Sequence, residues 1–207
     1  MAKKNKTHSA AQPKKKSIFK IMAIIFGILM ILAIVGTILP EPDSSYVKVN
    51  MEDYPEWIDF VVDRDAPASD SEALIDAANL VAKYNVSEKV LWQQMEENYS
   101  NEDTAYVKNH LNITWNQVCS AAASNYAKEM SRAKVLTKLQ KDQFTDEQID
   151  YANQKLNTFN FNETAAKKAS ELKKKENLSP DAISQKLSED QKFTETEVAY
   201  ALKQLTD

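Results

Sequence analysis

The stretch SRAKVLTKLQKDQFTDEQIDYANQKL, residues 131–156, decides the fold because two variants of it occur elsewhere in the chain. SEKVLWQQMEENYSNEDTAYVKNHL lies upstream at residues 87–111, and SPDAISQKLSEDQKFTETEVAYALKQL lies downstream at residues 179–205. Recurrence at such a period predicts tandem structural repeats. Three sets of residues align across the copies: Ala77, Ala121 and Ala169; Ser87, Ser131 and Ser179; and Tyr106, Tyr151 and Tyr200.

Each copy carries signals for the start of more than one helix. The recurring serine can cap a helix, because its oxygen accepts a hydrogen bond from a free backbone N–H. Further along, a hydroxyl residue is followed three positions later by an acidic or amide residue, the pattern of a capping box. These pairs are Ser100 with Asp103, Thr145 with Gln148 and Thr194 with Glu197; Ser69 with Glu72 and Thr114 with Gln117 predict further starts.

These signals predict an all-α fold in which each copy forms helix–turn–helix–turn–helix. The predicted repeats cover residues 71–112, 113–160 and 161–207. Both glycines of the chain, Gly27 and Gly36, precede this region. Tight β-hairpin turns depend strongly on glycine, so its absence from the repeats also favours helices.

The N-terminal part predicts a membrane anchor. Residues 1–17 form a polar basic tail, and residues 21–39 contain no charged residue. A helix of that length spans about 28 Å at about 1.5 Å per residue, close to a bilayer core of about 30 Å. We expect a transmembrane helix at residues 18–39. A cleaved signal peptide is the alternative, but the apolar run is long for one and no small-residue cleavage pattern follows it.

Charge predicts the topology. Residues 1–40 contain seven lysines and no acidic residue, which leaves 19 basic against 30 acidic residues in the remainder. By the positive-inside rule, we expect the N-terminus in the cytoplasm and the acidic repeats outside the cell, on a single-pass anchor in the cell membrane. A cytoplasmic regulator with inverted topology is an alternative.

Residues 40–70 are acidic, contain several prolines and are interpreted as a stalk or linker. Within this linker, Trp57, Ile58 and Phe60 are apolar enough to dock on the first repeat. Asp63 and Asp65 are interpreted as solvated carboxylates and not as a metal site.

The chain lacks the residue sets that most enzymes and metal sites use. Cys119 is the only cysteine, and His8 and His110 are the only histidines. We therefore expect no metal site, no cofactor and no catalytic residue, and we interpret Cys119 as a small buried residue. The acidic balance of the repeats also opposes nucleic-acid binding, which needs a basic face.

A protein partner is the remaining class of ligand, and two groups of residues are candidates to contact it. The first is acidic and recurs in the first turn of the last helix, although acids favour helix N-termini without any function. The second is the recurring tyrosine, which either packs on a neighbouring helix or forms a surface row. The candidate residues are Glu102, Asp103, Tyr106, Asp146, Glu147, Tyr151, Glu195, Glu197 and Tyr200.

The repeat resembles the Ltp repeat of host cell surface-exposed lipoproteins from Gram-positive bacteria and their prophages. The resemblance rests on Phe144-Thr145 and Phe193-Thr194, each followed by an acidic or amide residue, and on Tyr151-Ala152 and Tyr200-Ala201 before a final leucine. It covers roughly residues 73–205 and is looser in the first copy.

This resemblance implies a surface-exposed helical module without catalytic residues. It also implies superinfection exclusion, in which entry of phage DNA is blocked, with a basic phage protein such as a tape measure protein as a candidate partner. The chain departs from the family in having a predicted membrane helix in place of a lipid-bearing cysteine, and three copies where two are expected. A structural or interaction role in the cell envelope, with a wall or host protein as partner, is therefore the alternative.

Overall fold

The computed structural model describes residues 49–63 and 65–205. The predicted basic tail, residues 1–17, and the predicted transmembrane helix, residues 18–39, lie outside the described residues. Among the helices of the described part, none combines the length and the apolar composition that crossing a bilayer requires.

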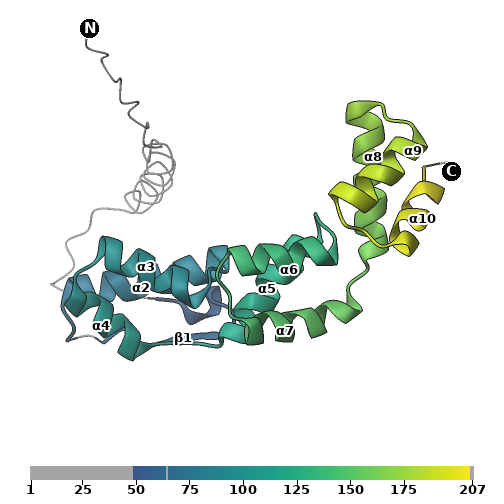
Figure 1. Cartoon of the computed structure of the whole chain (residues 1–207). Coiled ribbons are helices and arrows are strands. Elements are labelled where there is room, and N and C mark those ends of the chain that lie inside the picture. The colour runs from purple at the N-terminus through teal and green to yellow at the C-terminus, as the bar shows by residue number, and fades with distance from the viewer. Residues whose placement is uncertain (1–48, 64, 206–207) are drawn as a thin grey trace, which may run out of the picture. The chain divides into compact units, whose positions relative to one another are not determined.

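The described chain is mostly helical, which confirms the all-α class (Figure 1). Its principal helices form three successive groups of three, which we call modules 1, 2 and 3. In each module the first and third helices are the closest neighbours, and the second helix joins them. Module 1 contains α2 (Ala68–Tyr84), α3 (Glu88–Asn98) and α4 (Asn101–His110); module 2 contains α5 (Trp115–Ala127), α6 (Arg132–Lys141) and α7 (Asp146–Lys155), followed by η2 (Leu156–Thr158); module 3 contains α8 (Phe161–Glu176), α9 (Pro180–Gln185), η3 (Lys186–Asp190) and α10 (Glu195–Lys203).

The predicted caps of the second and third helices are confirmed. Ser87, Ser131 and Ser179 each accept a hydrogen bond from the backbone N–H three residues later. All three capping boxes are present in both directions. The predicted caps of the first helices are wrong: α2 begins after Pro67 and not at Ser69, and Thr114 precedes α5 without a side-chain cap.

The alignment of the first helices also differs from the prediction. Thr114 and Asn160 precede α5 and α8 with nearly the same backbone angles, φ −86°, ψ 87° and φ −87°, ψ 86°. Counting from these residues makes Ala123 the counterpart of Ala169, and both are fully buried, whereas Ala121 is partly exposed. The shift arises because α8 is longer than α5 and extends further before the next helix starts. The amino-acid sequences of the two helices do not reveal this difference in length.

A two-stranded antiparallel sheet was not predicted. Strand β1 (Ile58–Phe60) pairs with β2 (Leu111–Ile113), in the register Ile58 to Ile113 and Phe60 to Leu111. The strands lie far apart in the sequence, so no glycine-containing hairpin turn is needed to join them.

The N-terminal segment packs on module 1. After the turn η1 (Met51–Asp53), the side chains of Ile58 and Phe60 are buried, as expected for docking residues. The interpretation of residues 40–70 as a linker is therefore wrong for residues 49–63, because pairing with β2 and burial against α2 hold this segment in the fold.

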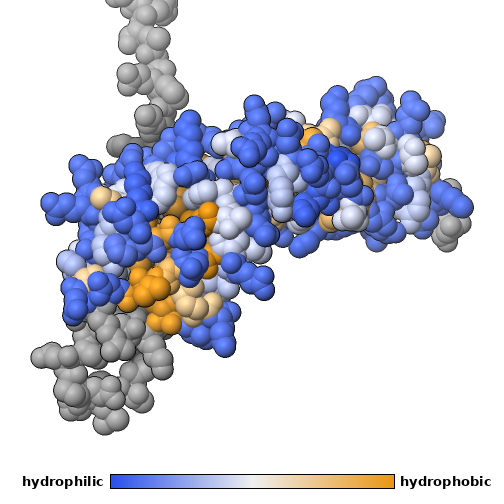
Figure 2. Space-filling view, turned by 90° about the horizontal axis from the view of Figure 1, so that it is seen from below, coloured by the Kyte–Doolittle hydropathy of each residue, from blue (hydrophilic) through white to orange (hydrophobic). Residues whose placement is uncertain are grey.

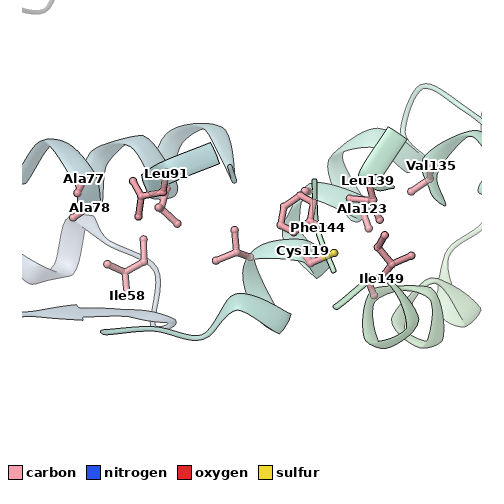
Figure 3. Close-up of a cluster of buried hydrophobic side chains, with 14 of the residues drawn as sticks. Ile58, Ala77, Ala78, Leu91, Cys119, Ala123, Val135, Leu139, Phe144 and Ile149 are labelled. Carbon is pink, nitrogen blue, oxygen red and sulfur yellow. The ribbon is translucent and has the colours of Figure 1, made fainter. Parts of the chain in front are cut away.

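Two buried apolar clusters stabilise the described chain. The first extends from the N-terminal segment through modules 1 and 2 to Phe161, and Figure 3 shows part of it, including Ile58, Leu91 and Phe144. The second lies within module 3 and includes Ile183, Leu187 and Phe193. Modules 1 and 2 thus share one buried core, whereas module 3 has its own.

The connection between the second and third helices differs in length by one residue from module to module. Tyr99 lies four residues after the buried Met95, Phe144 five after Leu139, and Phe193 six after Leu187. In module 3 the extra length is accommodated in η3, a π-helical turn in which the N–H of Gln191 bonds to the C=O of Lys186 at 2.9 Å. The capped third helix therefore starts in the same way in all three modules.

The recurring serine also joins one module to the next. The hydroxyl of Ser87 donates to the backbone oxygen of Asp142 in module 2 at 2.6 Å. The hydroxyl of Ser131 donates to the backbone oxygen of Gln191 in module 3 at 2.5 Å. Asp142 and Gln191 each lie two residues before the buried phenylalanine of their module, so the two bonds are equivalent.

These bonds predict different effects for two matched substitutions. Ser131→Ala removes a helix cap and a bond between modules, so it should lower the free energy of unfolding by about 2 kcal/mol, about 1 from each. Ser179→Ala removes a cap without such a bond and should lower it by about 1 kcal/mol. Urea denaturation of the dilute protein, followed by circular dichroism, measures both; equal losses would contradict a contribution from the bond between modules.

Candidate partner-binding surface

Two of the six candidate acids hold the backbone at the start of their own helix. The carboxylate of Asp103 accepts from the N–H of Ser100 at 3.1 Å, and that of Glu197 accepts from the N–H of Thr194 at 2.8 Å. In module 2 this place is taken by Gln148, which is nearly buried. These contacts give Asp103 and Glu197 a structural role that is independent of any partner.

The other four candidate acids, Glu102, Asp146, Glu147 and Glu195, are exposed in the first turns of α4, α7 and α10. Each first turn favours negative charge, because the helix N-terminus carries a partial positive charge. Within the described residues, no hydrogen bond or ion pair joins candidate acids of different modules. The structure thus places them as one small group on each module.

In module 1, further acidic residues lie near the candidate acids Glu102 and Asp103. Asp70, in the first turn of α2, lies beside Asp103 and Glu102 in the first turn of α4, because α2 and α4 pack together. Asp63, just before α2, is near the hydroxyl of Tyr106. We call Asp63, Asp70, Glu102 and Asp103 the acidic corner. The sequence alone does not indicate Asp70 as a member, because only the pairing of α2 with α4 brings it close to Asp103.

The two central carboxyls of the acidic corner differ in pKa. Burial raises the pKa of Asp70, and a hydrogen bond with Asp103 and the charges of Asp103 and Glu102 add to the rise. The pKa of Asp103 is lowered, first of all by the hydrogen bond that it accepts from the Ser100 hydroxyl. The Asp103 charge is therefore stabilised within the fold, whereas the Asp70 charge is disfavoured there.

The recurring tyrosines are half-buried, and each has a different neighbour. Tyr200 donates to the carboxylate of Glu163 in α8 of its own module at 2.8 Å. The ring of Tyr106 stacks on His110 with centroids 3.9 Å apart, and the ammonium of Lys155 lies 5.1 Å from the centre of the Tyr151 ring. Tyr200, which belongs to the last module, thus contacts another helix of its own module.

Cys119 and His110 have structural surroundings. Cys119 is fully buried in the first apolar cluster, and burial raises the pKa of its thiol to about 12 (Figure 3). The thiol is therefore protonated at neutral pH and unsuited to act as a nucleophile. His110 is the last residue of α4, and its Nδ1 lies 2.8 Å from the backbone oxygen of Tyr106.

Helix α8 carries a locally basic run, and ion pairs partly neutralise it; its members are Lys167, Lys168, Lys173, Lys174 and Lys175. Lys167 pairs with Glu129 of module 2 at 2.5 Å, which lowers the pKa of Glu129 and raises that of Lys167. Lys168 pairs with Glu171 at 3.3 Å. These pairs limit the phosphate-binding charge that this helix can present.

Exposed apolar residues are concentrated on module 1 and on the N-terminal segment that packs on it. Figure 2 shows a mostly hydrophilic face with an apolar area over this module. Among the described residues, Val61 beside β1 is 74% exposed and Tyr84 at the end of α2 is 45% exposed. Module 1 thus combines acidic and apolar surface.

Neutralising Asp70 tests the acidic corner by its pH dependence. The pKa of Asp70 is raised in the fold, so ionising it disfavours folding, and Asp70→Asn should raise the melting temperature at pH 7. The gain should shrink as the pH falls through the pKa of Asp70, where the wild-type carboxyl becomes neutral as well. Thermal melts between pH 3 and pH 7 measure this effect.

Asp150→Asn, at an exposed position in α7, serves as the control and should change the melting temperature little at any pH. A gain for Asp70→Asn that stayed constant over the whole pH range would contradict repulsion within the acidic corner.

A family model described as host cell surface-exposed lipoprotein matches the chain twice, over residues 114–156 and 160–205. The first match covers module 2 and the second covers module 3, each from the residue before its first helix. No curated protein and no solved structure matches the chain. Modules 2 and 3 thus match the Ltp family of host cell surface-exposed lipoproteins, which confirms the resemblance found in the sequence.

Proposed function

We propose that the chain is a non-catalytic binding protein, displayed on the cell surface by an N-terminal membrane helix, that blocks phage DNA entry by binding a basic phage protein. The family match supports display at the surface. The uncharged run at residues 21–39, with lysines on its N-terminal side, supports a single-pass anchor with a cytoplasmic N-terminus.

The acidic corner is the observation that supports a basic protein as the partner. It places four carboxylates at one end of module 1, and the pKa of one of them, Asp70, is raised by burial and further by its acidic neighbours. A cationic side chain from a partner would relieve this repulsion. The exposed acids of modules 2 and 3 extend the negative field, which speeds the encounter with a basic protein.

The mechanism that follows is occlusion. A phage protein that emerges near the membrane during DNA entry would meet the acidic modules before it reached the bilayer. Binding would hold it there, and no bond would need to be made or broken. Such binding depends on exposed charges and should weaken as salt is added.

Expression of the full chain in a phage-sensitive host tests this function. Plaque formation should fall while phage adsorption remains normal. Glu102→Lys places a positive charge in the acidic corner, and the loss of about 1 kcal/mol expected for an exposed charge pair weakens binding about fivefold, so plaques should partly return.

The matched control is Glu195→Lys, which makes the same change in the first turn of α10, outside the acidic corner. It should leave exclusion largely intact. Wild-type plaque counts with the unaltered chain would contradict exclusion, and equal effects of the two variants would contradict a special role for the acidic corner.

A cell-envelope role is the second candidate, and the apolar area on module 1 favours it, since exposed apolar patches mark protein contacts. Crosslinking in uninfected cells distinguishes it by capturing a wall or host protein. Protease treatment of intact cells tests the topology shared by both proposals, because modules outside the membrane should be removed and modules inside should be protected.

A further inference from the structure

Every module has two different ends. The short connections place the C-terminus of the first helix and the N-terminus of the second at one end, which we call the serine face. The N-termini of the first and third helices and the C-terminus of the second lie at the other end, which we call the acceptor face. In module 1 the acceptor face includes the acidic corner, because Asp70 lies in the first turn of α2 and Glu102 lies in the first turn of α4.

Consecutive modules join serine face to acceptor face. At both junctions the serine hydroxyl donates to the backbone oxygen that ends the second helix of the next module, at 2.6 Å for Ser87 and 2.5 Å for Ser131. Both serines are only 1% exposed. Further polar contacts occur at the second junction, where Lys134 donates to the side chain of Gln191 and Thr164 donates to the backbone oxygen of Ala127.

The serine face of module 3 has the same geometry and has no such acceptor among the described residues. Ser179 has φ −67° and ψ 157°, against −64° and 159° for Ser131, and it caps its helix in the same way. Its side chain is exposed, and within residues 49–63 and 65–205 nothing accepts a hydrogen bond from its hydroxyl.

The acceptor face of module 1 offers the matching group. Glu97 lies two residues before Tyr99, the position that Asp142 and Gln191 occupy before their phenylalanines. It is exposed in the last turn of α3, where backbone oxygens lack partners within the helix. Within the described part of the chain, module 3 thus presents a serine and module 1 an acceptor position of the kind that its own modules join, each without its counterpart.

The charges of these two faces are complementary. Near its end α8 carries the exposed lysines Lys173, Lys174 and Lys175 close to Ser179 in the sequence. The acids nearby are Asp181 and Glu176, and Glu176 is paired with Lys186, so the lysines dominate the charge of this face. Module 1 presents the acidic corner and the carboxylate of Glu97. Opposite charges brought together over a contact both steer association and fix its orientation.

We propose that the serine face of module 3 docks on the acceptor face of module 1 in a second copy of this chain. The contact continues the serine-to-carbonyl junction from one molecule to the next. It joins two different surfaces and therefore forms chains or rings of copies instead of closing as a symmetric dimer. Occupation of the acidic corner by Lys174 and Lys175 would also compete with a basic partner.

Site-directed crosslinking of the full chain in membranes tests this contact. One tagged copy carries Asp181→Cys beside Ser179, and a second copy with a different tag carries Asn98→Cys beside Glu97. A short bismaleimide should link the two tags. Cys119 is buried with a raised thiol pKa, so it does not compete for the reagent.

The control pairs Asp181→Cys with Asp150→Cys, an exposed position in α7 that lies on neither face. Linkage of the test pair should be at least about fivefold faster than that of the control. Equal rates for the two pairs would overturn the proposal.

A charge exchange separates docking from chance collision. Lys174→Glu with Lys175→Glu should lower linkage about fivefold, and adding Glu102→Lys in the other copy should restore much of it. A rate of linkage that did not change with these substitutions would also contradict the proposed contact. Plaque counts are a separate readout, so loss of exclusion with unchanged linkage, or the reverse, distinguishes failure of one proposal from failure of the other.

Discussion

The hydrogen bond from a helix-capping serine to the next module is the contact on which the arrangement of modules depends. A cap satisfies a backbone N–H at the start of a helix and needs only the oxygen of the hydroxyl. The hydroxyl hydrogen is then available for a second bond, and Ser87 and Ser131 use it to reach a neighbouring module. A single side chain thus fixes both a helix start and the position of the following module.

The acceptor of each bond is held in place by its own module. In module 2 the side chain of Asp142 accepts from the Tyr126 hydroxyl at 2.7 Å and pairs with Lys138, which fixes the backbone oxygen that Ser87 contacts. In module 3 the π-helical turn accommodates an added residue before Gln191. Different local solutions therefore present a carbonyl at the same place, and for this reason repeats of unequal length can stack.

Local signals in the sequence predicted the local structure well. A capping residue and its partner lie three positions apart, so Thr145 with Gln148 can be recognised without knowledge of the rest of the fold. The non-local features were missed. The pairing of β1 with β2 depends on strands about fifty residues apart, and the entry of Asp70 into the acidic corner depends on the packing of α2 against α4. The candidate acids were found because they recur, and the capping-box spacing distinguishes Asp103, which serves a cap, from Glu102, which does not.

Amide hydrogen exchange on Ser131→Ala tests most directly whether this serine couples modules. If the bond to Gln191 links modules 2 and 3, protection should fall both at the start of α6 and in the turn before Phe193, although the substitution lies sixty residues away from that turn. The buried helices of both modules should remain protected. A loss of protection confined to the start of α6 would contradict the coupling and reduce the serine to an ordinary helix cap.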